Sequence, residues 1–170
     1  MRDIELDGEI KRKRINVELD IPLAIIQNND LLLFQRRNKE PYKNLLGLLG
    51  GKKREREDLA TALKREILEE SGLEVISLKL LGIVREKHHD NDHIYNFNLH
   101  IFHVNCLGTL IHNKEEGKVI WTSVKEFKSF KKDFIPSDWL IVKNFLNKSF
   151  KDFCLSVFKS NKVYSIIVTN

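Results

Sequence analysis

One stretch of the chain has residues typical of helix caps at both of its ends. Asp58 stands where a helix N-cap is expected and Gly72 where a left-handed C-cap is expected, with LATALKREILEES between them. Asp favours the N-cap because its carboxylate accepts hydrogen bonds from free backbone amides, and Gly adopts positive φ without a steric penalty. Apolar residues recur between the caps at helical spacing: Leu59, Leu63 and Ile67. We therefore expect a helix over 59–71 whose apolar face packs on another layer.

The segments around this helix have the patterns of β-strands. A β-branched and aliphatic run at 15–26, turn residues at 28–30 and an apolar run at 31–34 indicate two strands joined tightly. Apolar and polar residues alternate at 95–101, which is typical of a half-buried strand. Further expected strands lie at 75–84, 119–121, 153–158 and 163–168, and a second helix at 138–146. The predicted fold class is α/β (α+β), with a mixed β-sheet sandwiched between α-helices.

Length and composition predict one domain over residues 1–170. The chain is 42% hydrophobic and 31% charged, and no Ser/Gly-rich linker interrupts it. Its formal net charge of +5 suits an anionic ligand. Cys106 and Cys154 fit no metal or redox spacing, and no long apolar segment is present. We therefore expect a cytoplasmic protein with reduced thiols and no membrane partner.

The predicted helix carries three carboxylates on one stripe, because Glu66, Glu69 and Glu70 are spaced by three and four residues. Like charges at this spacing repel one another, and the helix C-terminus adds to the repulsion. A hard divalent cation such as Mg²⁺ would relieve it, since such ions prefer carboxylate oxygens. The alternative is a solvated helix face on which Arg65 pairs with Glu69.

The whole string is Gly51, five residues, Glu57, seven residues, and then REILEESGL from Arg65 to Leu73. It resembles the Nudix box at every defined position. The resemblance implies a mixed sheet between helices, and a Mg²⁺- or Mn²⁺-dependent hydrolase that cleaves a nucleoside diphosphate linked to another moiety.

The resemblance also implies roles for individual residues. Glu66, Glu69 and Glu70 would bind the metal together with the carbonyl of Gly50, and Glu66 is also a candidate base for the attacking water. Arg65 and Glu57 would brace the unit formed by the loop and the helix. The catalytic group is thus Glu66, Glu69, Arg65 and Glu57. Displacement at phosphorus fits this set, because clustered metal ions neutralise charge on the attacking and leaving oxygens.

Beyond the box, the chain is similar to MutT-type members that hydrolyse purine nucleoside triphosphates, 8-oxo-dGTP included. LLLFQRR nominates Arg36 as a phosphate ligand, EEGKVIW nominates Glu116 as a further metal ligand, and FIPSDWLIVKNFL nominates Asp138 to read the purine. Lys52 is a further candidate for substrate binding. The alternatives are another nucleoside diphosphate derivative (ADP-ribose, a dinucleotide or a capped RNA end) and a binding module without turnover. The expected partner is the nucleotide substrate. The chain is expected to be a monomer or a homodimer.

The sequence departs from the family pattern in the loop before the helix and just before the glycines. Arg54 replaces an acid or amide, Arg56 replaces a glycine, and Leu46 stands where some relatives that recognise 8-oxoguanine have asparagine. Two further clusters of polar residues are expected to have no binding role. The histidines at 88, 89 and 93 are expected in a polar hairpin loop rather than at a metal, and the basic run at 11–14 is expected to be solvated rather than bound to nucleic acid.

Overall fold

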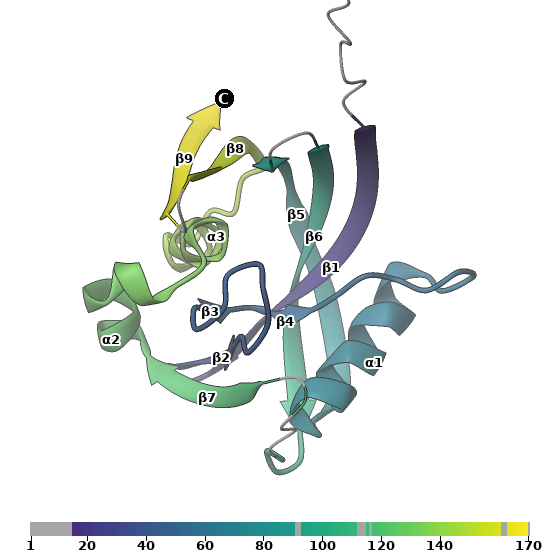
Figure 1. Cartoon of the computed structure of the whole chain (residues 1–170). Coiled ribbons are helices and arrows are strands. Elements are labelled where there is room, and N and C mark those ends of the chain that lie inside the picture. The colour runs from purple at the N-terminus through teal and green to yellow at the C-terminus, as the bar shows by residue number, and fades with distance from the viewer. Residues whose placement is uncertain (1–14, 91–92, 112–114, 116, 161–162, 170) are drawn as a thin grey trace, which may run out of the picture.

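The computed structural model describes residues 15–90, 93–111, 115, 117–160 and 163–169 (Figure 1). Its strands form one mixed sheet in the order β3-β2-β1-β6-β5-β8-β9, with β4 beside β1 and β7 beside β2. Their bounds are β1 Ile15–Asn28, β2 Leu31–Arg36, β3 Leu46–Gly47, β4 Leu49–Gly50, β5 Glu74–Asp90, β6 His93–Leu107, β7 Lys118–Ser123, β8 Phe153–Ser160 and β9 Val163–Thr169. β1 and β6 run parallel, as do β5 and β8, whereas β5–β6 and β8–β9 are antiparallel pairs.

The helices lie on both faces of this sheet, as the sequence predicts. They are α1 (Leu59–Ser71), α2 (Val124–Ser129) and α3 (Pro136–Leu146), with a 3₁₀ turn at Lys131–Asp133. Figure 1 shows α1 on one side of β1, β5 and β6, and α2 and α3 on the other. Successive residues of β1 alternate between two apolar cores, because neighbouring side chains of a strand point to opposite faces. Ile25 packs with Ile141 of α3, and Ala24 packs with Leu63 of α1.

Helix α1 begins and ends where its caps predict. The carboxylate of Asp58 accepts a hydrogen bond from the amide of Thr61 at 2.7 Å. Gly72 ends the helix with φ 73°, and its amide donates to the carbonyl of Leu68. Leu63 and Ile67 are fully buried, so the helix is fixed against the sheet and holds its carboxylates at one place on the molecule.

The β5–β6 hairpin is longer than the sequence predicts, which corrects the expectation for the histidines. His88 and His89 belong to β5 and His93 begins β6, so they do not lie in a hairpin loop. The physical reason is pairing on both sides: β5 is hydrogen-bonded to β6 and also, in parallel, to β8, where His88 lies opposite Val157. No cluster of three His, Cys, Asp or Glu side chains suited to a metal ion occurs among the described residues.

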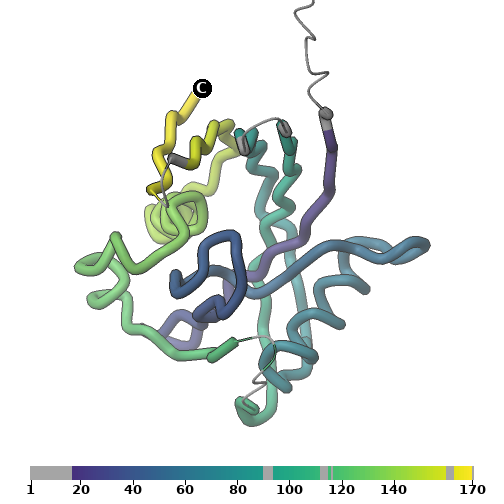
Figure 2. Tube along the Cα trace, viewed as in Figure 1, coloured from purple at the N-terminus to yellow at the C-terminus, as the bar shows by residue number. Residues whose placement is uncertain are grey.

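The C-terminal hairpin β8–β9 returns beside α3 (Figure 2). Tyr164 of β9 contacts Tyr42, with ring centroids 4.3 Å apart, and its hydroxyl accepts a hydrogen bond from the Tyr42 amide at 3.2 Å. The loop after β2 and the C-terminus are therefore held together. None of the helices in the described part of the chain is long and apolar enough to span a membrane. Both thiols, Cys106 and Cys154, are free and half-buried.

Candidate active site

A cavity of about 620 Å³ opens between the sheet, α3 and the loops around β3 and β4. One end is lined by Gly50, Gly51 and Lys52, which lead into α1. The other end is lined by side chains from β5, β6 and α3. This volume suits a small-molecule ligand of nucleotide size.

The first end of the cavity touches the carboxylate stripe of α1 directly. A side chain at Gly51 would begin 2.7 Å from the carboxyl carbon of Glu66, so the backbone there approaches the carboxylate closely. The amide of Gly50 donates to Oε2 of Glu70 at 3.1 Å. Gly50 has φ 139°, and a Cβ there would collide with the carbonyl of Pro22. Glycine is therefore required at 50 for conformation and space.

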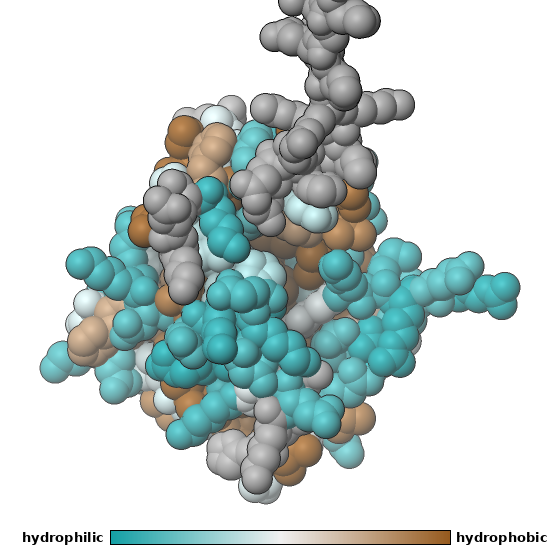
Figure 3. All heavy atoms as spheres, in the orientation of Figure 1, coloured by the Kyte–Doolittle hydropathy of each residue, from teal (hydrophilic) through white to brown (hydrophobic). Residues whose placement is uncertain are grey.

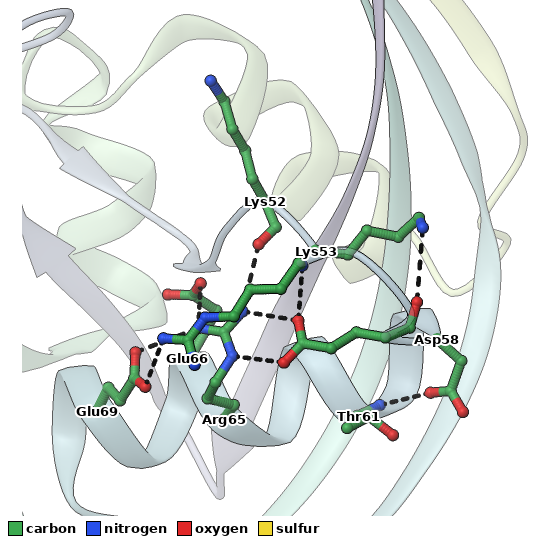
Figure 4. A network of polar contacts seen from close by, with 9 residues as sticks. Lys52, Lys53, Asp58, Thr61, Arg65, Glu66 and Glu69 are labelled. Atoms are coloured by element: carbon green, nitrogen blue, oxygen red, sulfur yellow. Dashed lines mark hydrogen bonds and ion pairs between the residues drawn. The ribbon is translucent and has the colours of Figure 1, made fainter.

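Arg65 connects the carboxylates to one another (Figure 4). Its Nη1 contacts Oε1 of Glu66 at 2.7 Å and Oε2 of Glu69 at 3.2 Å. Its Nε donates to Oε1 of Glu57 at 2.8 Å, and its Nη2 donates to the carbonyl of Lys52 at 3.3 Å. The guanidinium thus ties the loop to the helix, which is the bracing role implied for Arg65 and Glu57.

Glu57 is firmly held in its ionised form. Hydrogen bonds from the Arg65 guanidinium and from the Arg54 amide lower the pKa of its carboxyl group to about 2. The hydrogen bonds of Arg65 to Glu57 and Glu66 in turn raise the pKa of its guanidinium. A charge-assisted network of this kind fixes side-chain orientation, because each bond has an ionised partner.

The residues of the stripe fit a hard divalent ion by their chemistry. Glu66, Glu69 and Glu70 offer carboxylate oxygens, the ligands that Mg²⁺ and Mn²⁺ prefer. In this conformation Arg65 lies between two of them, and no three potential ligands within the described ranges converge on one point. An ion would therefore be bound with rotation of exposed side chains such as Glu69, whose side chain is 46% accessible.

The loop before α1 extends from the body of the molecule as a hydrophilic arm (Figure 3). Arg54 and Arg56, the two departures from the family pattern, lie there. Nη2 of Arg54 pairs with Oε1 of Glu69 at 3.2 Å. Arg56 has φ 67°, so the conformation that usually favours glycine is kept although the residue has changed.

Asp138 lies at the other end of the cavity, in the first turn of α3. Its Oδ2 accepts a hydrogen bond from the amide of Leu48 at 2.7 Å, and the residue is 6% exposed. Burial raises the pKa of its carboxyl group to about 7. The helix N-cap is Ile135, so Asp138 does not serve as the cap. A buried acid that faces a cavity and makes no ion pair within the described part of the chain suits the binding of a donor on a ligand.

Three further polar residues at this end were missed by the sequence analysis. Glu86 and His88 of β5 and Tyr42 of the loop after β2 line the cavity, and each is at most 8% exposed. The Tyr42 hydroxyl and Nδ1 of His88 lie 3.2 Å apart and share a hydrogen bond. Alternation along β5 could have indicated Glu86 and His88, but every residue from 85 to 90 is polar; no local pattern indicates Tyr42, which lies in a loop.

Of the remaining predicted site residues, some line the cavity and others do not. Lys52 lines the cavity, whereas Arg36 does not: its Nη1 donates to the carbonyl of Asn44 at 2.8 Å, and Arg37 lines the cavity in its place. Leu46 is buried in the core. Glu116 and the basic run at 11–14 lie outside the described residues.

Comparison with known proteins agrees with this geometry. The model of the NUDIX domain family matches residues 20–145, which is well over half of the chain. The chain belongs to the NUDIX family. It is thus a Nudix hydrolase that acts on a nucleotide derivative. A search of curated proteins finds no significant match.

Several solved structures share the fold of this Nudix hydrolase. The mutator MutT protein from Bacillus halodurans matches with a TM-score of 0.67 at 21% identity, over 87% of this chain and 97% of that one. The E. coli ORF135 protein matches with a TM-score of 0.60 at 25% identity, over 77% and 90%. A NUDIX hydrolase from Nitrosomonas europaea matches with a TM-score of 0.67 at 18% identity, over 78% and 90%. The predicted mixed sheet between helices is confirmed.

Proposed function

We propose that this Nudix hydrolase converts a purine nucleoside triphosphate into the monophosphate and pyrophosphate, with Mg²⁺ or Mn²⁺ as cofactor. 8-oxo-dGTP is one candidate within this class. The observation that carries the proposal is the continuity of the cavity from Asp138 to Gly51, which packs against Glu66. A nucleotide bound along it would place its base among buried acids and its phosphates beside Lys52 and the carboxylate stripe.

The metal would be held by carboxylates and one backbone oxygen: Glu66, Glu69, Glu70, Glu116 and the carbonyl of Gly50. When bound, it supplies charge neutralisation on the phosphate oxygens. The position of Gly51 against Glu66 supports this arrangement, because it brings the lining of the cavity into contact with a carboxylate of the stripe.

The chain's own residues would carry the proton and hold the geometry. Water attacks phosphorus, the bridging P–O bond of the α–β anhydride breaks, and Glu66 takes the proton that the water loses. Arg65 and Glu57 keep the loop and the helix in register during this step through contacts of 2.8 Å or less on either side of the guanidinium. Lys52 would contact the phosphates. Arg36 would have to leave the Asn44 carbonyl to do so.

Asp138 would read the purine. It is buried, faces the cavity and is oriented by the Leu48 amide, so its carboxyl group is preorganised for a base edge. A site built to hydrogen-bond a base rejects a base without the matching group strongly, because its own polar groups are left unpaired.

A substrate panel tests the proposal. Purine and pyrimidine triphosphates, 8-oxo-dGTP, ADP-ribose, a dinucleotide and a capped RNA end would each be incubated with Mg²⁺ or Mn²⁺ and with excess chelator, and the products identified. We expect fastest turnover of a purine triphosphate, release of pyrophosphate and no turnover with chelator. Faster turnover of ADP-ribose, the dinucleotide or the capped RNA end would show that the substrate is another nucleoside diphosphate derivative and not a purine triphosphate. Nucleotide binding without any turnover would indicate a binding module.

A further inference from the structure

The inner end of the cavity contains a second carboxylate besides Asp138. Along β5, Val84, Glu86 and His88 are buried, whereas Arg85 and Lys87 between them are exposed. This alternation points Glu86 inward, since neighbouring strand residues face opposite sides. Glu86 is 5% exposed and lines the cavity.

The carboxylate of Glu86 has weak support from the protein. Within the part of the chain that is described, it accepts no hydrogen bond, and Nδ1 of His88 lies 3.7 Å from its Oε1. That nitrogen is already engaged with the Tyr42 hydroxyl at 3.2 Å. A buried carboxylate is costly unless it is hydrogen-bonded. Glu86 therefore has acceptor capacity that a ligand in the cavity can fill.

The two acids face the same space. The charge of Glu86 is close enough to raise the pKa of Asp138, together with the larger effect of burial. Two cationic residues of the lining, Lys52 and Lys159, are exposed, whereas Arg37 is half-buried and its charge partly opposes the raised pKa of Asp138. The lining thus combines buried acids with exposed lysines, which matches a ligand whose buried end donates hydrogen bonds and whose outer end is anionic.

We propose that Glu86 is a specificity-determining residue that accepts a hydrogen bond from an exocyclic amino group of the base, while Asp138 contacts the neighbouring ring N–H. The inference rests on the proposed function, because it assumes that the cavity takes a nucleotide. An edge with a ring N–H beside an amino group is the edge of guanine. Adenine and cytosine place an acceptor beside the amino group, and uracil and hypoxanthine have no amino group.

The test compares two ligands that differ by that amino group alone. GMP and IMP would be titrated into the full chain by calorimetry, with Glu86→Gln as the variant and Glu40→Gln as the matched control. Glu40 also lines the cavity, but it is exposed at the rim. We expect the wild type and Glu40→Gln to bind GMP about 10- to 100-fold more tightly than IMP, the range for a hydrogen bond to a charged acceptor. Glu86→Gln should lose most of this preference while binding IMP as before.

Several outcomes would overturn the inference: equal binding of GMP and IMP to the wild type, an undiminished preference in Glu86→Gln, tighter binding of AMP than GMP, or no binding of any of them. Melting curves would establish that the variants are folded. Should a variant fail to fold, the comparison of GMP and IMP binding to the wild type still tests the inference. The readout needs neither metal nor turnover. A GMP preference that depends on Glu86 in a protein that hydrolyses no triphosphate would refute the proposed function alone, and triphosphate hydrolysis with equal GMP and IMP binding would refute this inference alone.

Discussion

The two ends of the cavity use the same kind of residue in opposite ways. At the α1 end, the carboxylates of Glu57, Glu66 and Glu69 are partly exposed and share the guanidinium of Arg65, which lowers the pKa of Glu57 to about 2. At the inner end, Asp138 makes no ion pair to any described residue, and burial raises the pKa of its carboxyl group to about 7. The first environment keeps Glu57 ionised as a partner of Arg65, and the second raises the pKa of Asp138 through burial. Environment rather than residue type therefore sets these two pKa values in opposite directions.

The largest expected effect comes from the α1 end. Glu69→Gln keeps the side-chain shape and removes a ligand charge, so kcat should fall at least about 100-fold, beyond the range for residues that act through a metal ligand. The melting temperature should change little, because the variant loses a like-charge repulsion and also the exposed ion pairs of Glu69 with Arg54 and Arg65. Steady-state kinetics with Mg²⁺ checks this, and wild-type rates with unchanged metal dependence would move the metal site elsewhere.

At the inner end we expect a smaller, selective effect. Asp138→Ala should lower kcat/KM for purine triphosphates by about 5- to 150-fold, which corresponds to about 1–3 kcal/mol for a lost buried hydrogen bond. Pyrimidine triphosphates should change less. Parallel kinetics on 8-oxo-dGTP, dGTP and dCTP makes the comparison, and an equal loss on all three would show that Asp138 supports the structure and does not read the base.

The pH dependence of stability should have opposite signs at the two ends. Between about pH 4 and 7, folded Asp138 holds a proton that the unfolded chain has lost, so its contribution to the free energy of unfolding decreases as pH rises. The slope is at most about 1.4 kcal/mol per pH unit. Glu57 does the reverse: its contribution is lost as pH falls from about 4.5 to 2.

Urea unfolding of Asp138→Asn and Glu57→Gln over pH 2–8 separates these contributions. Asp138→Asn should remove the loss of stability between pH 4 and 7 and leave the acid limb intact. Glu57→Gln should weaken the acid limb alone. Identical profiles for the wild type and Asp138→Asn would mean that the carboxyl group of Asp138 is not shifted by burial.

The smallest expected effect is that of replacing Arg54, whose guanidinium forms an ion pair with a carboxylate oxygen of Glu69. Both partners are exposed, so the pair contributes little, about 0.2–1 kcal/mol. Arg54→Ala should therefore raise the affinity for Mn²⁺ by no more than about fivefold, measured by titration of the protein without nucleotide. Arg56→Ala, on the same loop, is the control, and equal changes in both variants would indicate a general charge effect.

The sequence predicted the α1 end better than the inner end for a physical reason. Helix boundaries at Asp58 and Gly72 are local, because each cap acts on amides or carbonyls within a few residues. The carboxylate stripe then follows from helical spacing alone. The mixed sheet was likewise predicted from periodicity, and β1, β2, β8 and β9 lie where expected.

The inner end depends on contacts between distant segments. Glu86 and His88 are buried because β8 pairs with β5 about 70 residues later, whereas the polar run from 85 to 90 suggested an exposed loop. The sequence nominates Arg36, whereas its neighbour Arg37 lines the cavity in the structure, because successive residues at a strand end point to opposite sides. Tyr42 meets Tyr164 across 122 positions, which no local pattern encodes.

We propose above all that one end of the cavity performs the reaction and the other selects the base. It is tested most directly by the ratio of kcat/KM for dGTP to that for dCTP in Glu69→Gln and in Asp138→Ala. We predict that Glu69→Gln lowers both values and leaves the ratio at its wild-type level, whereas Asp138→Ala lowers the ratio about tenfold or more. A ratio changed by Glu69→Gln, or unchanged by Asp138→Ala, would contradict the division of roles.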